Sequence, residues 1–278
     1  MAILLDYSQI VFGQIITDLN RKDSGFNTVN KDLVRHLCLN QICSFNNKFK
    51  NKYGQMVICM DTRVKYWRKQ EFAYYKFKRG EDRKASDVDW GNLFDIMNEI
   101  RAEVIEEIPL LTFEVDHMEA DDLIASLVRY PEKHMIVSSD GDFQQLQIFP
   151  NVSQYSPLTK KLVKCDDPQT YLAEHIVRGD KGDGIPNIRV DSDFFYRKSL
   201  GDEGRQPAVT KKFLANIDQE LKDEELKARW IQNKSLIDLV HVPKDRHDLI
   251  LALFTRAVTE HRQKRYNLYS YMMKNRLR

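Results

Sequence analysis

Residues 118–142 read MEADDLIASLVRYPEKHMIVSSDGD and place two acidic clusters at the ends of apolar elements. Apolar residues recur at helical spacing over 123–128, and Met135–Val137 is a short run typical of a buried strand. Carboxylates crowded at the edge of a hydrophobic sheet raise one another's pKa unless cations neutralise them. Because these clusters offer oxygen donors without a paired His or Cys, we expect Mg²⁺ or Mn²⁺ there rather than Zn²⁺.

Two earlier segments repeat this arrangement of an apolar strand followed by an acid. Ala2–Leu5 is predicted to form a buried strand that ends at Asp6, and Met56–Met60 a second strand that ends at Asp61. Open α/β sheets bind ligands beyond the carboxyl ends of their parallel strands. One such Asp is commonly a coincidence or a helix cap, whereas two in succession followed by two acidic clusters favour a shared site.

The spacing of apolar residues along the rest of the chain predicts the α/β class. We expect a mainly parallel central sheet flanked by helices, in one α/β core at residues 1–165 followed by a helical part at 166–278. Within the core, the segment 63–89 interrupts the alternation of strands and helices. Helices are expected at 30–53, with Gly54 as the C-terminal cap, and at 89–109, strands at 110–115 and 134–139, and an edge hairpin at 152–163.

Charge is distributed unevenly along the 278 residues, although the net charge is only +2. Residues 63–84 carry nine Lys/Arg against three acids, residues 109–142 two against eight, and residues 256–278 seven against one. This pattern suits a polyanion that is held by basic arms over an acidic, metal-binding floor. A solvated face explains the C-terminal basic run equally well.

The basic arch at 63–89 interleaves cations with aromatic side chains. Its aromatics are nearly continuous rather than confined to one helical stripe, which favours an arm that neutralises phosphates and stacks on bases over a plain connecting helix. The glycine-rich turn at 178–186 can expose backbone N–H groups to a phosphate. The residues expected to contact nucleic acid are Arg68, Lys69, Lys76, Lys78, Arg79 and Lys181.

The acids are too numerous for one ion but fit two nearby sites. Two metals roughly 3.5–4 Å apart can bind a scissile phosphate, activate the attacking water and steady the leaving oxygen. The sequence therefore predicts metal-dependent phosphodiester hydrolysis. The candidate ligands are Asp6, Asp61, Glu119, Asp121, Asp122, Asp140, Asp142, Asp180 and Asp183.

Cysteine usage and hydropathy bear on the compartment. The four cysteines form no C-x-x-C pair, and Cys38 and Cys59 lie among apolar neighbours, so we expect buried thiols in a reducing, cytoplasmic environment. Asp6 interrupts the apolar start, no segment approaches a membrane-spanning length, and no secretion signal is expected. We expect a monomer without membrane contact.

Several motifs together resemble those of the flap endonuclease/5′-nuclease family, most strongly those of its members in T-even bacteriophages. They cover the chain up to about residue 200 and the rest more loosely. The resemblance implies a 5′-nuclease (PIN-like) fold, 5′→3′ removal of RNA primers and short DNA from duplexes, and cutting of 5′ flaps during DNA replication. The motifs are Asp6, Asp61, Tyr75-Lys76-x-x-Arg79, Glu119-Ala120-Asp121-Asp122, Ser139-Asp140-Gly141-Asp142 and Gly179-Asp180-x-x-Asp183-x-Ile185-Pro186.

The resemblance also implies residue roles. Lys76 and Arg79 match arch residues that contact and position the phosphate, so both are expected to be catalytic. Arg68 is a third residue expected to contact the phosphate. Asp122 would support either of two Mg²⁺ ions, for which Mn²⁺ can substitute. The first ion would be surrounded by Asp6, Asp61, Glu119, Asp121 and Asp140, and the second by Asp142, Asp180 and Asp183.

Substrates and partners follow from the same resemblance. The expected substrates are branched or nicked duplex DNA and RNA–DNA hybrids, bound partly by the helical part at 166–278. The resemblance also suggests two protein partners, a single-stranded DNA-binding protein and a sliding clamp. Gly184 and Asn187 replace the Asn and Gly of many family members, so the grip on downstream duplex is expected to be altered.

Two other functions are weighed against this one. A PIN-type endoribonuclease acting on single-stranded RNA also gathers acids at strand ends. The basic arch and the Gly-Asp turn argue against this function. A non-catalytic binder of DNA junctions, with structural ions, would tolerate the loss of individual acids.

Overall fold

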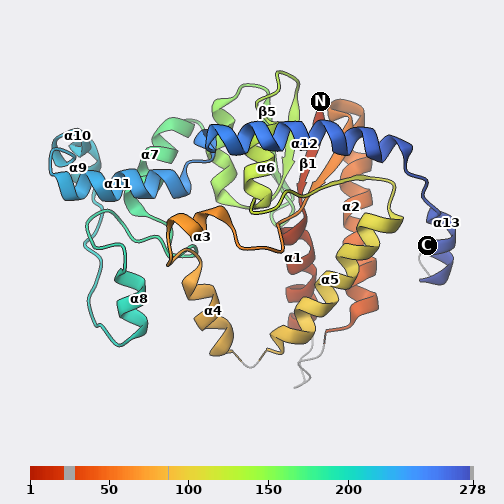
Figure 1. The fold of residues 1–278 in the computed structure, drawn as a ribbon, viewed down its shortest axis with the longest axis horizontal. Coiled ribbons are helices and arrows are strands. Elements are labelled where there is room, and N and C mark those ends of the chain that lie inside the picture. Colours follow the sequence, from red (N-terminus) through yellow and green to blue (C-terminus); the bar gives the residue numbers. More distant parts are fainter. Residues whose placement is uncertain (22–28, 87, 276–278) are drawn as a thin grey trace.

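A six-stranded sheet forms the centre of the computed structural model, which describes residues 1–21, 29–86 and 88–275 (Figure 1). The strand order is β3-β2-β1-β4-β5-β6, and every neighbouring pair is parallel except the antiparallel β5–β6 hairpin. The expected α/β class and edge hairpin are confirmed. The strands are β1 (Ala2–Asp6), β2 (Gln55–Cys59), β3 (Leu111–Phe113), β4 (His134–Val137), β5 (Val152–Ser156) and β6 (Lys161–Val163).

The register of the central strands sets the position of the acids. Asp6, the last residue of β1, pairs with Cys59 at the end of β2, and Leu5 pairs with Val137 at the end of β4. The residues that follow β2 and β4 therefore leave the sheet at the same edge as Asp6, because parallel strands end on the same side.

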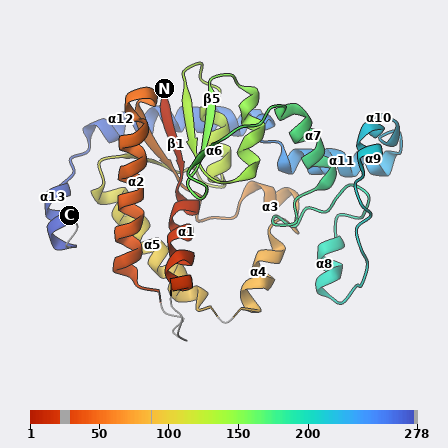
Figure 2. The same cartoon turned by 180° about the vertical axis from the view of Figure 1, so that it is seen from behind.

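Helices cover both faces of the sheet. Along β1, Ile3 and Leu5 point into one apolar cluster and Leu4 into the other, as the period of two requires. Helix α2 lies in front of the sheet in Figure 2, and α12 crosses in front of it in Figure 1. The first cluster includes α1 (Tyr7–Arg21), α2 (Lys31–Tyr53) and α5 (Trp90–Glu107); the second includes α6 (Ala120–Leu127), the 3₁₀ helix η1 (Gly141–Ile148) and α12 (Lys244–Gln263).

Caps set the ends of the long helices, and the predicted C-terminal cap at Gly54 is confirmed. The Asn30 side chain accepts a hydrogen bond from the Leu33 N–H at 3.1 Å at the start of α2. Gly54 ends that helix with φ +77°, and its N–H donates to the Lys50 carbonyl. Asp89 caps α5 by accepting from the Asn92 N–H at 3.1 Å.

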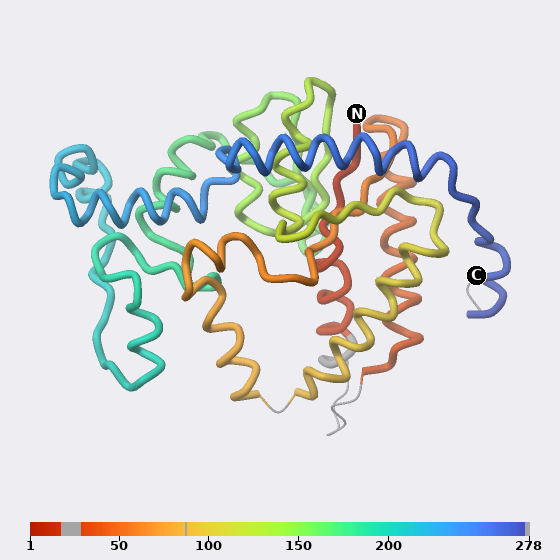
Figure 3. The backbone as a smooth tube through the Cα atoms, in the orientation of Figure 1, coloured from red at the N-terminus to blue at the C-terminus, as the bar shows by residue number. Residues whose placement is uncertain are grey.

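The basic arch leaves the sheet after β2 and returns through α5, as the tube in Figure 3 traces. It contains α3 (Trp67–Glu71) and α4 (Phe77–Lys84). The prediction that its aromatics stack on bases is wrong for Trp67, Phe72 and Tyr75, which are at most 5% exposed and pack in apolar clusters. These rings anchor the arch to the core, and mainly its polar side chains remain outside.

The C-terminal half is helical, but it is not confined to one end of the molecule. Leu239, Val242 and Ile250 pack with Val57 and Phe113 of the sheet, so α12 completes the core that the first half begins. The remaining helices are α7 (Pro168–Arg178), α8 (Phe194–Ser199), α9 (Lys211–Ala215), α10 (Ile217–Glu220), α11 (Glu224–Ile237), η2 (Leu239–His241) and α13 (Leu268–Lys274).

The burial of the four cysteines matches the prediction for two of them. Cys38 and Cys59 are buried as expected, and Cys43 and Cys165, which are free like them, are exposed and half-buried. Among the residues that the structure describes, no helix combines the length and the apolar character needed to cross a membrane.

Candidate active site

Two strand-end carboxylates are held at the edge of the sheet by hydrogen bonds. Asp6 accepts from the Ser138 hydroxyl at 3.2 Å and the Gln9 N–H at 3.3 Å, and is only 7% exposed. Asp61 accepts from the Ser8 hydroxyl at 2.5 Å and the Ala120 N–H at 2.9 Å. Donors from α1 and from the start of α6 therefore fix both side chains in place.

Asp121 and Asp140 complete this group, which we call the sheet-edge cluster (Asp6, Asp61, Asp121 and Asp140). Burial, followed by the charges of Asp61 and Asp140, raises the pKa of Asp6 to about 7. Burial also raises the pKa of Asp121 well above its ordinary value, and Asp140 and Asp6 add to this effect against the opposing charge of Lys76. The mutual repulsion expected from the sequence is confirmed, and it is the condition that a divalent cation relieves.

Glu119 lies beside this cluster but is surrounded by cations and donors. Its carboxylate, 1% exposed, bonds to Lys76 Nζ, to the Tyr75 hydroxyl at 2.9 Å and to Arg68 Nη1 at 3.0 Å. Burial by itself raises the pKa of Glu119, but Lys76 and Arg68 outweigh it and hold that pKa below its ordinary value. Glu119 is thus charged at neutral pH and links the sheet-edge cluster to the arch.

Arg68 and Asp122 form a buried pair, which corrects two predictions. Arg68 is 2% exposed; its Nη2 lies 2.8 Å from Asp122 Oδ1 and its Nε donates to the Leu236 carbonyl at 2.9 Å. The prediction that Arg68 contacts nucleic acid is wrong, because its guanidinium points into the protein. Asp122, fully buried, also accepts from Trp67 Nε1 and from the Glu119 N–H at 3.0 Å each, so its oxygens face protein donors rather than the cluster.

Loss of the Arg68 charge should destabilise the fold. In Arg68→Met, Asp122 and Glu119 lose a buried partner, and we expect the free energy of unfolding to fall by about 3–5 kcal/mol. Thermal unfolding followed by circular dichroism measures this effect. Arg63→Met, at an exposed position of the same segment, is the control and should leave Tm unchanged. Equal Tm values for the two variants would contradict the structural role.

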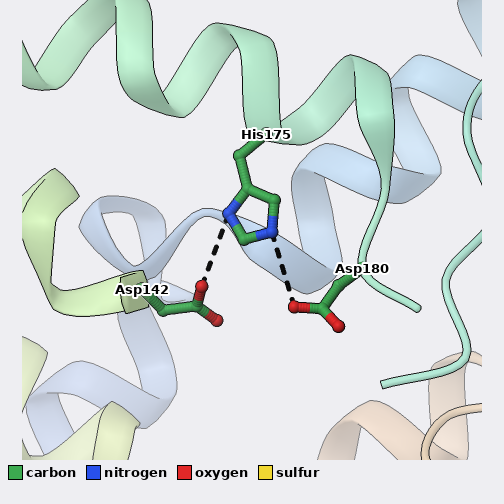
Figure 4. A group of neighbouring side chains, drawn as sticks. All are labelled: Asp142, His175 and Asp180. Carbon is green, nitrogen blue, oxygen red and sulfur yellow. Dashed lines mark ion pairs between the residues drawn. The ribbon is translucent and has the colours of Figure 1, made fainter. Parts of the chain in front are cut away.

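A second group contains a residue that the sequence reasoning missed. His175 of α7 stands between Asp142 and Asp180, with Nδ1 3.4 Å from Asp142 Oδ1 and Nε2 3.4 Å from Asp180 Oδ2 (Figure 4). One ligand atom from each residue lies within 4.8 Å of the others, so the three could hold a metal ion. The prediction that only oxygen donors surround the metal site therefore missed the His175 imidazole. Its sequence signal is its place in the last turn of the helix that ends at Gly179, just before the Gly-Asp turn.

The three side chains of this second group shift one another's pKa. Burial and then the charge of Asp140 raise the pKa of Asp142 to about 7. Burial lowers the pKa of His175, but its bond to Asp180 and the charges of Asp142 and Asp180 outweigh burial and raise it. Burial likewise opposes ionisation of Asp180, yet the His175 and Asp183 N–H bonds hold that pKa below its ordinary value.

The Gly-Asp turn carries Asp183 against the base of the arch. Arg79 Nη2 lies 2.6 Å from Asp183 Oδ1, and Lys76 Nζ lies 3.8 Å from the other oxygen. The Lys76 N–H donates to the Asp183 carbonyl at 2.7 Å. Gly184, at φ +75°, permits this approach, because a Cβ there would lie 2.8 Å from the Tyr74 carbonyl oxygen. Lys76 thus lies between Glu119 and Asp183, and Arg79 pairs with Asp183.

The remaining predicted cations lie farther out. Lys69 is half-buried, and burial followed by the charge of Lys76 lowers its pKa. Lys78 pairs with Asp82 at 2.8 Å, and Lys181 is exposed in the Gly-Asp turn. These three surround the site without contacting the acids through an ion pair in the described part of the chain.

Without divalent ions, the raised pKa of Asp6 should make stability depend on pH. The protonated form is favoured in the fold, so this stabilisation is complete below pH 4 and is lost as the pH rises through about 7. Asp6→Asn removes the penalty, and in EDTA at pH 8 we expect a gain of about 2 kcal/mol, or roughly 4–8 °C in Tm. At pH 4 the two proteins should unfold together. Scanning fluorimetry measures both, and a lower Tm for Asp6→Asn at pH 8 would contradict the charge argument.

Two family models together match residues 3–278 of the chain. Residues 3–175 match the family described as 5′-3′ exonuclease, N-terminal resolvase-like domain, and residues 167–278 match the one described as T4 RNase H, C terminal. The chain is 33% identical over 286 residues to the Ribonuclease H of Enterobacteria phage T4, in an alignment that covers 98% of this chain and 90% of that protein.

Solved structures from bacteriophage T5 share the fold. A flap endonuclease in a pseudo-enzyme-product complex with DNA and metal ions aligns with a TM-score of 0.64 at 17% identity, over 95% of this chain and 99% of that chain. The T5 5′-exonuclease with bound zinc aligns with a TM-score of 0.63 at 17% identity, over 92% and 98%. At this level of identity the likeness concerns the fold alone.

Proposed function

The chain belongs to the 5′-3′ exonuclease family, and from this premise we propose that it is a metal-dependent, structure-specific nuclease that removes RNA primers and cuts 5′ flaps during DNA replication. Its substrates would be branched or nicked duplex DNA and RNA–DNA hybrids. The observation that carries the proposal is the pair of acidic groups at one sheet edge, with Lys76 and Arg79 directly beside them.

We propose two Mg²⁺ ions as the cofactor. When bound, they would neutralise the acids, polarise the scissile phosphate and lower the pKa of the attacking water. Burial and, after it, repulsion between neighbouring carboxylates raise the pKa of Asp6, Asp121 and Asp142, and bound cations would relieve both effects. The first ion would be held by the sheet-edge cluster and Glu119, and the second by Asp142, Asp180 and Asp183, with His175 either as a further ligand or as a donor to those acids.

Asp122 has a supporting role in this proposal. It holds Arg68, and Arg68 in turn holds Glu119, so Asp122 fixes the position of a ligand through two buried bonds. Residues that orient a metal ligand in this way commonly cost about 10–100-fold in metal affinity or activity when they are replaced.

Lys76 and Arg79 would receive the phosphate. In the protein without metal, their charges pair with Glu119 and Asp183. Once cations neutralise those acids, the ammonium and the guanidinium can donate to phosphate oxygens, and Arg79 can do so in a bidentate manner. The burial of Lys76 beside Glu119 keeps it positioned for that exchange.

Product analysis tests this function. The substrates are a 5′-labelled flap, a nicked duplex and an RNA–DNA hybrid, each incubated with Mg²⁺ or with Ca²⁺. We expect short products from the 5′ end with Mg²⁺ only. Cleavage confined to single-stranded RNA would indicate the PIN-type endoribonuclease instead, and binding without cleavage of any substrate would indicate the junction binder.

The organisation of the chain and its partners are proposed on the same premise. We propose a core at 1–165 that includes the arch at 63–89, a helical DNA-binding part at 166–278, and a monomer acting in the cytoplasm of the host cell. A single-stranded DNA-binding protein and a sliding clamp are candidate partners. Light scattering measures the mass in solution, and affinity capture with each purified partner tests the contacts.

A further inference from the structure

A buried arginine outside both groups of acids contacts the backbone of one candidate metal ligand. Arg101 of α5 is 6% exposed, and its Nη1 donates to the Asp61 carbonyl oxygen at 2.9 Å. Its Nη2 pairs with Glu114, which directly follows β3. One guanidinium therefore joins the segments that leave two neighbouring strands, β2 and β3, near the edge of the sheet that carries the acids.

The packing of α5 fixes the direction of this side chain. Ile100 and Val104 of the same helix are fully buried in the apolar cluster that also contains Leu5 and Ile58 of the sheet. Because these two residues anchor the helix on either side of Arg101, they set the rotation of α5 against the sheet. The same helix brings the chain back from the basic arch (Figure 3).

Hydrogen bonds hold the backbone on both sides of Asp61. The Met60 N–H and the Thr62 N–H donate to backbone carbonyls of the neighbouring chain at 2.9 Å and 3.1 Å. Arg101 supplies the donor for the carbonyl of Asp61 itself, which lies between them. Without that donor the Asp61 peptide is free to rotate, and the carboxylate on the same residue moves with it.

We propose that Arg101 is a positioning residue for the metal ion that the sheet-edge cluster would hold. The planar guanidinium spans Glu114 and the Asp61 carbonyl at once, and so keeps the Asp61 carboxylate beside Asp6. Residues that orient a metal ligand commonly contribute about 10–100-fold to metal affinity. This inference rests on the proposed function and adds to it a residue that contacts neither the substrate nor the metal.

Binding of Mn²⁺ to the full chain without DNA tests this role. Electron paramagnetic resonance measures free Mn²⁺ and therefore the affinity of each ion. In Arg101→Met the affinity of one ion should fall about 10–100-fold, and that of the other ion should stay unchanged. Arg101→Lys should give a smaller loss, because an ammonium keeps the buried charge but does not span both partners.

Arg35→Met is the matched control for loss of a buried arginine. Arg35 of α2 is also 6% exposed and pairs with a glutamate, Glu103, at 2.6 Å. In the part of the chain that the structure describes, it forms no hydrogen bond with the sheet-edge cluster. Both Arg→Met variants should lower Tm by a similar amount, but only Arg101→Met should weaken Mn²⁺ binding. Equal Mn²⁺ affinity of Arg101→Met, Arg101→Lys and wild type would overturn the proposal.

A double variant tests whether the effect passes through Asp61. Asp61→Asn alone should weaken binding of the same ion, and adding Arg101→Met should weaken it no further, because the ligand that Arg101 positions is already lost. Additive losses would overturn the positioning role. Cleavage of a nicked duplex by wild type in Mg²⁺ is measured separately. A protein whose Mn²⁺ affinity depends on Arg101 but that cuts no substrate would contradict only the proposed function.

Discussion

Asp121→Asn should abolish cleavage while DNA binding stays nearly intact. The substitution keeps the shape of the side chain and removes one negative charge from the sheet-edge cluster, where that charge is needed to hold a cation. We expect the single-turnover rate in Mg²⁺ to fall by at least about 10³-fold. Affinity for nicked duplex in Ca²⁺, measured by anisotropy, should change by less than about threefold.

An exposed acid nearby provides the matched control. Asp116→Asn lies in the loop before α6 and outside the cluster, so it should retain the wild-type rate. Turnover retained by Asp121→Asn in Mg²⁺ would exclude the catalytic assignment. Asp121→Asn should also raise Tm in EDTA at pH 8, because burial and the charge of Asp140 oppose ionisation there.

Lys76→Ala should slow the chemical step far more than it weakens binding. Lys76 lies between Glu119 and Asp183 and is nearly enclosed, so its ammonium is a positioned donor rather than a mobile surface charge. We expect a loss on the order of 10²–10³-fold in single-turnover rate at saturating DNA. A change of a few-fold in Kd is expected at the same time.

Lys65→Ala, an exposed lysine of the same arch, separates positioning from general attraction. It should reduce affinity slightly and flatten the salt dependence of binding without slowing the chemical step. An effect of Lys76→Ala confined to affinity would show that Lys76 only tethers the substrate. Lys76→Arg should recover little activity, because a planar guanidinium is larger than an ammonium and directs its donors in a fixed fork.

The position of the strand-end acids could be predicted from the sequence. Apolar runs that end in Asp6, Asp61 and Asp140 imply parallel strands, and the ends of parallel strands must meet at one edge. Neither step requires a tertiary contact to be known.

The roles of Asp121 and Asp122 could not be separated in this way. Both lie in the first turn of α6, and only the rotation of that helix against the sheet decides which carboxylate faces the site. The roles of Arg68 and Trp67 likewise depend on tertiary contacts that the sequence does not show. Their residue types suggest a nucleic-acid surface, but they have buried partners from distant segments, including the Leu236 carbonyl, 168 residues along the chain.

His175 illustrates another limit. Its helix shows an ordinary apolar pattern, and a single histidine on such a helix is usually a satisfied core or surface residue. Its role depends on the turn at Gly179, where φ is +68° and a Cβ would lie 2.3 Å from the Pro186 carbonyl oxygen. This turn folds Asp180 back against the imidazole, and local spacing does not indicate that geometry.

The path of α12 has a consequence for how such proteins can be recombined. The two family matches divide the sequence near residue 170, yet α12 covers the face of the sheet that carries Leu4 and Val57. A chimaera joined at that boundary would bring a foreign helix onto this apolar face and leave mismatched side chains in its interior. A chimaera of two relatives should therefore fold when residues 239–263 come from the same parent as the strands of the sheet. The segments that must stay together are those that share a core, although they are far apart in the sequence.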